Sequence, residues 1–587
     1  MRPHEPLVFL DGMATFCTIN FLTLAHVGSL PTIPSAIQLT VFAFAALILT
    51  ASAASAAGRV DARVAAGFDA IEVRDLRADL TFLASDQLEG RMSLERGSEI
   101  AVQFIAAEFA KARLTPTQAG SYLQPVPLIE YLPDVPQTQL VLRRDGKEQR
   151  YEFLKHFIGF FPREVAATAP VVFAGYGITS PQFNYDDYAG FDARGKIVLV
   201  FDHEPQENDP DSIFNGIGNT TASNVRLKVL NAQRHGAVGV LIVAEPNRKH
   251  PSNLERLARI PGIMDRFTRR PSQALLDNNG ITIPYFTIND DVGAALLANA
   301  GKPASELQSS IDRTLKPAPI SLRDTVVEMR VVNASSRRAT TYNVVGLLEG
   351  NDAALNNESI VFSGHFDHEG VWDGKIYHGA DDNGTGTAGV IALARAFSRN
   401  ADKPKRSLVF AVFAAEERGL LGSYFYAANP ARPLAGTRAV INFDMIGRNE
   451  APSPQTEGLT QISADTSNEL GLIGTINSPD YRSAVEQANQ HVGLVLNYKW
   501  DQDSALNIFQ RSDQFPFAIR DVPAVWWFTG FHPDYHQPSD TVEKINFDKM
   551  QRILQLAYLT GWSFADAPAP PRYVRAPVSA KASKQAR

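Results

Sequence analysis

The sequence predicts an α/β protein with a doubly wound mixed sheet and a second, smaller β/α domain. Two observations predict this fold. Apolar runs typical of buried strands alternate with helical patterns through the second half of the chain, as in doubly wound sheets. Between residues 170 and 297, several shorter apolar runs flank a helical pattern at residues 227–235, which indicates a separate core in that segment.

Length and composition agree with at least two folded domains. The chain has 587 residues, of which 44% are hydrophobic and 20% charged, so it exceeds the ~100–200 residues of a single domain. Its formal net charge of −7 shows no basic excess, so the sequence does not indicate a nucleic-acid partner. Cys17 is the single cysteine, which excludes disulfide scaffolds, Cys-ligated zinc and iron–sulfur clusters and leaves histidines and carboxylates to carry chemistry.

The beginning of the chain has the pattern of a targeting segment. An apolar run at residues 41–49 is followed by overlapping Ala-x-Ala sites at residues 51–57, which is typical of a signal peptide. A membrane anchor is the alternative, but the run is shorter than the ~20 residues that a membrane-spanning helix needs. We therefore expect export to the periplasm or the extracellular space, with no stable membrane insertion after processing.

Helical stripes predict helices over residues 68–84 and 99–114, and short strands follow at residues 138–142 and 151–154. A stretch of small residues near Glu164 indicates the first domain boundary. The expected divisions are residues 1–57 for the signal peptide and the region upstream of it, 65–163 for the first part of the main domain, 164–300 for the smaller domain, 301–340 for a connector, 341–565 for the main part of the main domain and 566–587 for a disordered tail.

Four apolar runs in the second half lead directly into acids and histidines. Ligands of open α/β sheets bind at the carboxyl ends of the strands, so this placement predicts one crevice that gathers residues distant in sequence. A loop with Asp381, Asp382 and Asn383 opens a predicted helix over residues 385–397 and adds further carboxylates. The side chains at the strand ends are His365 and Asp367, Glu416 and Glu417, Asp444, and His536.

These residue types predict a metal site. Two histidines and at least three carboxylates suit zinc, with manganese and cobalt also possible. The surplus of carboxylates favours two metals about 3.5–4 Å apart that share a bridging carboxylate, and hydrolysis as the reaction class. Taken singly, Asp381-Asp382-Asn383 also fits a turn and helix cap, and Glu416-Glu417 also fits the acidic first turn of a helix. The joint placement at strand ends favours the metal site.

Other sequence patterns do not indicate a different chemistry. The stretch at residues 384–389 fits G-x-G-x-x-G, but it follows acidic residues instead of an apolar strand, and carboxylates there would repel a pyrophosphate. No G-x-S-x-G motif occurs in the sequence, which argues against an α/β serine hydrolase.

The motifs together resemble a known family. His365-x-Asp367, Gly379-Ala380-Asp381-Asp382-Asn383, Glu416-Glu417, Asp444-Met445 and Tyr535-His536-x-Pro538-x-Asp540-Thr541 occur in the order found in M28-family zinc aminopeptidases. The segment from residue 170 to residue 297 resembles a protease-associated (PA) domain, which accompanies this family as an insertion without catalytic residues. The resemblance implies a mixed sheet of the zinc-dependent exopeptidase type with an inserted PA-like domain.

The resemblance also implies residue roles and an activity. Asp381 would bridge two zinc ions per chain, His365 and Asp444 would complete one site, and Glu417 and His536 the other. Glu416 would be the general base, and Asp367 would accept the free ring N–H of His365. The enzyme would remove N-terminal residues from peptides with a zinc-activated water. His368, His378 and His532 match no ligand position, whereas Ser512, Asp513 and Tyr535 match positions near the site.

Two alternatives stay open. A carboxypeptidase of the glutamate-releasing type shares this architecture, including the PA domain, and a binding protein on the same fold would need no metal. Filled positions at all five implied ligands and at the base favour an enzyme over the binding protein. A glutaminyl cyclase also resembles the main domain, but it lacks the insertion, so the PA-like segment argues against this function. The sequence gives no indication of oligomeric state.

Overall fold

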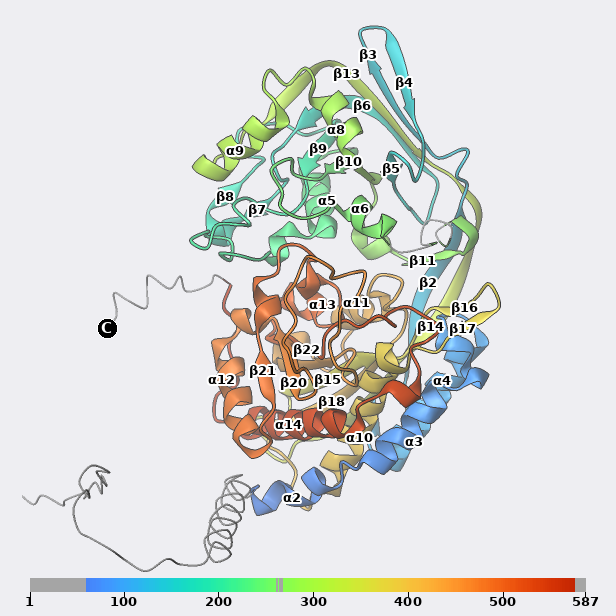
Figure 1. Cartoon of the computed structure of the whole chain (residues 1–587), viewed down its shortest axis with the longest axis vertical. Coiled ribbons are helices and arrows are strands. Elements are labelled where there is room, and N and C mark those ends of the chain that lie inside the picture. The colour runs from blue at the N-terminus through green and yellow to red at the C-terminus, as the bar shows by residue number, and fades with distance from the viewer. Residues whose placement is uncertain (1–59, 260–261, 263–265, 267, 576–587) are drawn as a thin grey trace, which may run out of the picture. The chain divides into compact units, whose positions relative to one another are not determined.

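The computed structural model describes residues 60–259, 262, 266 and 268–575, and its elements are drawn in Figure 1. The described residues fall in one compact unit, Gly58–Arg587. The predicted α/β class is confirmed, because helices cover a mixed sheet in the way expected. The expected signal peptide and Cys17 lie outside the described residues. Within the described ranges, no helix has the length and apolar character needed to span a membrane.

The main lobe is built on a ten-stranded sheet, counted over the described residues. Its central strands β18, β15, β19 and β22 are neighbours and run parallel, whereas β14 pairs antiparallel with both β2 and β18. In spatial order the strands are β11 (Ser272–Leu275), β2 (Leu123–Pro133), β14 (Asn333–Leu348), β18 (Ser407–Phe413), β15 (Ser359–His365), β19 (Thr437–Phe443), β22 (Ala524–Phe528), β20 (Glu469–Ile473) and β21 (Val495–Asn497), with β1 (Thr115–Pro116) paired to β14.

Helices cover both faces of this sheet, which explains why its central strands are apolar throughout. Successive side chains of a strand point to opposite faces, and in β15 Ile360 and Phe362 join one hydrophobic core while Val361 joins another. The first core includes helices α2 (Ala62–Asp69), α3 (Val73–Leu83), α4 (Arg96–Lys111), α10 (Gly386–Arg399), α12 (Pro479–Ala488) and α14 (Phe547–Asp566), and the other face carries α11 (Leu421–Ala428) and α13 (Phe515–Ala518).

Helix α14 packs against the sheet at a glycine. A Cβ atom placed on Gly561 would lie 2.2 Å from the Cζ atom of Phe362 on β15, so any larger residue would push the helix away from the strand. The predicted helices over residues 68–84 and 99–114 correspond to α3 and α4, and the predicted helix over residues 385–397 corresponds to α10.

The second, smaller body of the unit is the insert lobe, formed by an eight-stranded sheet and helices α5 (Val225–Arg234), α6 (Asn253–Ala258), α8 (Asp290–Leu297) and α9 (Ala304–Thr314). Strands β6, β9, β10 and β12 run parallel, and their core is separate from those of the main lobe. The spatial order of described strands is β4 (Lys147–Tyr151), β3 (Gln139–Arg144), β13 (Ile320–Val331), β6 (Val165–Phe173), β9 (Ile197–Phe201), β10 (Gly239–Val243), β12 (Tyr285–Ile288) and β5 (Phe157–Ile158).

The insert lobe extends beyond the residues 164–300 expected for the smaller domain. Strands β3, β4 and β5 precede that range and β13 follows it, yet all four pair within the insert-lobe sheet. The expected connector at residues 301–340 contains α9, β13 and the start of β14. The limits of the insert lobe are set by which strands pair with one another. The apolar pattern of a short strand does not reveal which sheet that strand joins.

The end of the chain is ordered further than expected. Helix α14 ends at Asp566, and beyond it the amide of Val574 donates to the carbonyl oxygen of Asn477 at 2.7 Å. Arg572 forms an ion pair with Asp480 on α12 at 2.8 Å. Part of the tail expected to be disordered, residues 567–575, therefore contacts the main lobe, and the remainder lies outside the described residues.

A buried aspartate organises one turn of the insert lobe. The carboxylate of Asp187 accepts hydrogen bonds from the amides of Tyr176 and Ile178, both at 3.0 Å, and from the hydroxyl of Tyr185 at 2.6 Å. Burial raises the pKa of Asp187 to about 7, and the three hydrogen bonds oppose burial without cancelling it. The folded protein therefore binds this proton more tightly than the unfolded chain does.

We expect the contribution of Asp187 to the stability of the protein to fall as pH rises from about 4 to about 7. Each unit of difference in the pKa of Asp187 contributes about 1.4 kcal/mol, so the loss reaches at most about 4 kcal/mol. An Asp187→Asn variant should flatten this dependence, since its amide oxygen can accept from the two amides and its NH2 can donate to Tyr185. Urea unfolding at several pH values measures the effect. As a control, Asp192→Asn, at an exposed aspartate, should keep the wild-type dependence of the free energy of unfolding on pH between 4 and 7. The same dependence in Asp187→Asn would contradict the assignment of this effect to Asp187.

Candidate metal centre

The side chains singled out in the sequence meet at one edge of the main sheet. Parallel strands β18, β15, β19 and β22 end there together, so residues far apart in the chain become neighbours. His365 ends β15 and is followed by Asp367 and His368, Glu416 and Glu417 follow β18, Asp444 follows β19, His532 and His536 follow β22, and Asp381 and Asp382 lie in the turn Ala380–Thr385 that leads into α10.

One group of possible metal ligands, the His365 group, consists of His365, Asp382 and Asp444. The Nε2 atom of His365 lies 3.5 Å from Asp444 Oδ1 and 3.6 Å from Asp382 Oδ1. Its other ring nitrogen, Nδ1, lies 3.2 Å from the carbonyl oxygen of Asp367, which can only accept, so the proton of the neutral ring belongs on Nδ1. Nε2 is buried without a hydrogen-bond partner and presents its lone pair to carboxylates. This arrangement fits a cation.

A second group, the His536 group, consists of His368, Asp382, Glu417 and His536. The Nε2 atom of His536 lies 3.0 Å from Asp382 Oδ2 and 3.2 Å from Glu417 Oε2. His368 Nδ1 lies 2.8 Å from Glu417 Oε1. Sequence reasoning left His368 outside the ligand set because it matches no family position, but the turn after β15 places it against Glu417.

Asp382 belongs to both groups, and each of its carboxylate oxygens faces a different one. Oδ1 faces His365 and Oδ2 faces His536. A carboxylate in this position can bridge two ions, which is the arrangement of two-metal hydrolases. Histidine nitrogens with carboxylate oxygens and no thiolate are ligands that zinc accepts.

The geometry differs from the expected bridging role of Asp381. Asp381 Oδ1 accepts hydrogen bonds from the amide of Gly447 at 2.7 Å and from the hydroxyl of Thr385 at 3.2 Å, and its Oδ2 lies 3.2 Å from His532 Nε2. Adjacent residues of the turn direct their side chains differently, so Asp381 faces the start of α10 and Asp382 faces the histidines. Spacing in the sequence cannot choose between two adjacent aspartates.

Asp367 also differs from expectation. Its carboxylate lies 3.9 Å from His365 Nδ1, and the ring N–H is directed at the main-chain oxygen of Asp367. The carboxylate accepts the amides of Glu416 at 3.0 Å and Glu417 at 3.3 Å. Asp367 therefore positions the backbone that carries both glutamates. Glu416 lies in neither ligand group, but its Oε2 is 3.7 Å from His365 Nε2.

The site concentrates buried negative charge. Burial lowers the pKa of His365, but the carboxylates of Glu416 and Asp444 outweigh it and hold that pKa well above its usual value. Burial also raises the pKa of Glu416 well above its usual range, although His365 opposes this change. The same field that holds protons here attracts divalent cations.

Several neighbours fix the turn and the strand ends. Asp540 Oδ2 accepts the amides of Asp381 at 2.9 Å and Asp382 at 3.1 Å. The side chain of Asn383 donates to the carbonyl oxygen of Phe443, which joins the turn to β19. The expected support from Ser512 is a hydrogen bond from its hydroxyl to Asp444 Oδ2 at 2.6 Å.

Arg91 is a contributor that sequence reasoning missed. Its guanidinium is buried and donates to the carbonyl oxygens of Phe366 at 2.7 Å, His378 at 2.7 Å and Gly379 at 2.8 Å. It thereby holds the turn after β15 beside the loop that leads to Asp382. A lone arginine in a polar turn gives no pattern in sequence that could have identified it.

The remaining residues near the motifs lie at the margin of the site. His378 Nε2 lies 2.8 Å from Asp86 Oδ1, and His378 belongs to neither ligand group. The ring of Tyr535 stacks on His536, and its hydroxyl accepts from Arg511 at 3.2 Å. Arg448 forms an ion pair with Asp534 at 2.8 Å. Asp513 is buried, and burial raises its pKa to about 7.

Comparison with known proteins identifies two domains. Residues 343–560 match the model of peptidase family M28, and residues 167–296 match that of the PA domain. A leucine aminopeptidase 2 of Trichophyton rubrum is 30% identical over 241 residues, which are 38% of this chain and 44% of the relative. A leupeptin-inactivating enzyme 1 of Streptomyces exfoliatus is 27% identical over 259 residues, which are 40% of this chain and 52% of the relative. The chain thus spans about half the length of the curated relatives it matches.

Among solved structures, an aminopeptidase from Aneurinibacillus sp. strain AM-1 aligns with 87% of this chain and 97% of its own, at 19% identity and a TM-score of 0.48. A zinc aminopeptidase from Bacillus subtilis aligns with 85% of this chain and 97% of its own, at 17% identity and a TM-score of 0.40.

The two adjacent aspartates provide a direct test of the shared ligand position. An Asp382→Asn variant should lose up to two equivalents of bound zinc relative to the wild type, because both groups lose a charged oxygen. An Asp381→Asn variant should keep the wild-type content, since its amide oxygen can still accept from Gly447 and Thr385. Zinc is measured by elemental analysis of the folded proteins. Loss of zinc in Asp381→Asn together with retention in Asp382→Asn would instead support Asp381 as the bridging ligand, as the family resemblance implies.

Proposed function

Because residues 343–560 are a peptidase family M28 domain and residues 167–296 a PA domain, we propose that this chain is a zinc-dependent aminopeptidase that removes N-terminal residues from peptides. The observation that carries the proposal is the position of Asp382. Its two carboxylate oxygens face His365 and His536 separately, which supports two ions per chain. His365 and Asp444 would complete one site, and Glu417 and His536 the other, with His368 against Glu417.

Bound zinc would supply Lewis acidity that polarises the scissile carbonyl and lowers the pKa of water. The side chains of this protein supply the proton transfers and the orientation. Glu416 is the residue that we propose as general base, because it lies beside His365 and outside both ligand groups. It takes a proton from the attacking water and passes that proton to the nitrogen of the leaving amine as the C–N bond breaks. A carboxylate held beside the proposed metal site, outside both ligand groups, is a group that can accept this proton and return it.

The site is asymmetric in its access to solvent. The side chain of His536 is 17% exposed, whereas that of His365 is 1% exposed. A peptide would therefore approach from the His536 side. The names of the leucine aminopeptidase relatives support removal of residues from the amino terminus.

Export forms part of the same proposal. The apolar run at residues 41–49 and the Ala-x-Ala sites after it support processing by a signal peptidase and release of the peptidase to the periplasm or the extracellular space. Peptides available outside the cytoplasm would then be the substrates.

Replacing the proposed base should separate catalysis from metal binding. We expect Glu416→Gln to lower kcat roughly 10²–10⁴-fold while the zinc content stays at the wild-type value. The adjacent Glu417→Gln is the matched comparison, and it should lose zinc because it removes a charged oxygen from the His536 group. Steady-state kinetics and elemental analysis on the same preparations measure both. Near-normal turnover by the Glu416→Gln enzyme would contradict the assignment of Glu416 as the general base.

The substrate class is tested with aminoacyl chromogenic amides that carry either a free or a blocked amino terminus. We expect hydrolysis of the free amines alone, at a rate that falls when a chelator removes zinc. Activity confined to peptides with a C-terminal acidic residue would instead assign a carboxypeptidase of the glutamate-releasing type. A protein that binds these peptides without cleaving them, even with full zinc, would be a binding protein.

A further inference from the structure

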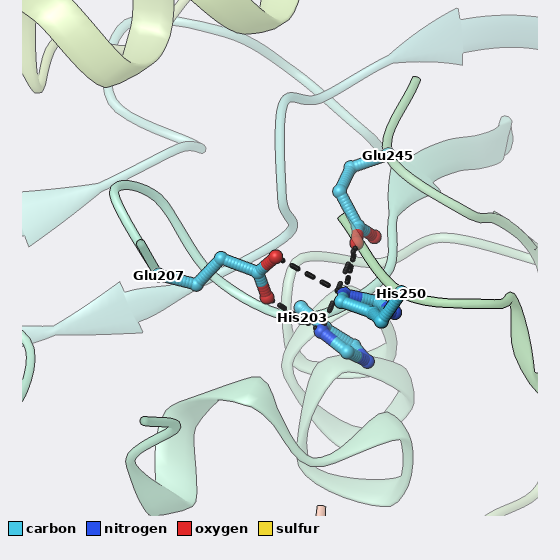
Figure 2. Close-up of side chains that lie close together, drawn as sticks. All are labelled: His203, Glu207, Glu245 and His250. Carbon is cyan, nitrogen blue, oxygen red and sulfur yellow. Dashed lines mark hydrogen bonds and ion pairs between the residues drawn. The ribbon is translucent and has the colours of Figure 1, made fainter. Parts of the chain in front are cut away.

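The insert lobe contains a buried cluster of two histidines and two glutamates, shown in Figure 2. His203 and Glu207 follow β9, and Glu245 and His250 follow β10. Because β9 and β10 are neighbouring parallel strands, their carboxyl ends bring the four side chains together. Each of these side chains is at most 4% exposed. The cluster belongs to the insert lobe and shares no residue with the His365 or His536 groups.

The four side chains direct their polar atoms at one point. Glu207 places Oε2 2.6 Å from His203 Nδ1 and Oε1 3.0 Å from His250 Nε2. Glu245 Oε1 lies 3.0 Å from His250 Nε2 and 3.7 Å from His203 Nδ1. Zinc bonds of about 2.0–2.2 Å in a tetrahedron place ligand atoms about 3.3–3.6 Å apart. The cluster is therefore close to the size that four ligands around one ion require.

The proton of His250 is located by its other contact. Nδ1 lies 3.0 Å from the carbonyl oxygen of Pro251, which can only accept a hydrogen bond. In the neutral ring the proton is therefore on Nδ1, and Nε2 presents a lone pair to two carboxylate oxygens at 3.0 Å each. Three lone pairs that converge in a dry interior repel one another unless a cation lies between them.

The second oxygen of the Glu245 carboxylate and its lack of other donors add to this sign of a missing cation. Its carboxylate is 1% exposed, and neither of its oxygens accepts a hydrogen bond among the described residues. Buried carboxylates are normally hydrogen-bonded, paired or bound to metal. Glu245 is directed at the histidine nitrogens and meets no hydroxyl or amide donor there, which is the environment of a metal ligand.

Two asparagine side chains, Asn507 and Asn219, lie on the outer side of His203. Its Nε2 lies 2.9 Å from the side-chain amide of Asn507. A ring that binds metal through Nδ1 carries its proton on Nε2 and needs an acceptor there. Rotation of the Asn507 amide by 180° would present its oxygen to that proton. Because this oxygen accepts from the side-chain amide of Asn219, Asn219 would have to rotate as well, and its own oxygen, which has no hydrogen-bond partner among the described residues, would then accept from Asn507.

We propose that His203, Glu207, Glu245 and His250 form a third metal site, specific for a divalent cation of the zinc type. Two imidazole nitrogens and two carboxylate oxygens without thiolate suit zinc in a tetrahedron. Two carboxylates neutralise the two charges of the ion. Because all four positions are filled by protein atoms, the site is structural and holds together the loops that follow β9 and β10. This proposal does not depend on the proposed peptidase activity.

The alternative is that no metal binds and both histidines are protonated. Two imidazolium rings would also neutralise the two carboxylates. Metal content of the full-length protein separates these cases. We expect His250→Gln and Glu245→Gln each to bind one equivalent of zinc less than the wild type. A glutamine can still hydrogen-bond the remaining cluster, so the proton alternative predicts no change in zinc. The matched control is His235→Gln, because His235 lies in the same lobe and stacks on the ring of Tyr188.

The same difference must persist when the main-lobe site is impaired. In an Asp382→Asn background, adding His250→Gln should remove one further equivalent of zinc, so a failure of the proposed peptidase site leaves this result intact. Equal zinc content with and without His250→Gln overturns the proposal. If the variants do not fold, anomalous scattering at the zinc edge from crystals of the wild type decides it. A peak between the four side chains supports the site, and its absence from zinc-equilibrated crystals overturns it.

Discussion

Like charges crowded into an interior repel one another strongly, and the main lobe brings Asp382, Asp444, Glu416 and Glu417 to one sheet edge where little water reaches to screen them. Nearby imidazoles offset part of this charge, and cations bound between the two groups would offset much of the rest. The parallel strands cause much of this crowding, since β18 leads to Glu416 and Glu417 and β19 leads to Asp444 at the same edge, where the turn before α10 adds Asp382. The architecture of the sheet and the affinity of the site for cations therefore have a common origin.

Holding the carboxylates in place requires bonds that come from elsewhere in the chain. The amides of the turn that carries Asp382 are bound by Asp540, and the amides of Glu416 and Glu417 are bound by Asp367. Both supports are themselves buried acids that accept main-chain N–H groups. Arg91 adds the buried guanidinium that fixes carbonyl oxygens of two loops at the site. The ligands are thus oriented by a second set of residues whose main partners are backbone atoms.

The sequence predicted the α/β sheet and its helices, because the apolar runs are long enough to recognise, and it marked acids and histidines at strand ends that the structure brings together. It could not decide what depends on side-chain direction or strand pairing. Asp381 and Asp382 are adjacent, and only the path of the turn decides which one faces the histidines. The fold likewise decides the partners of two other residues. His368 lies against Glu417, and Asp367 accepts the amides of Glu416 and Glu417. The limits of the insert lobe depend on pairing of β3 and β13, and the four-residue cluster after β9 and β10 combines two short patterns that are unremarkable when taken alone.

Strand β11 changes how the insertion should be understood. It lies between β10 and β12 in sequence, yet it pairs antiparallel with β2 at the edge of the main sheet. The chain thus leaves the insert lobe to add one strand to the main lobe and then returns. Without β11, the main-chain groups of β2 on that side would lack their ladder partners and form an open edge available to other chains. The insertion thus ends this side of the main sheet in a strand of four residues, and a short edge strand offers few main-chain groups to another chain. Local unfolding of the insertion that released β11 would uncover the longer β2.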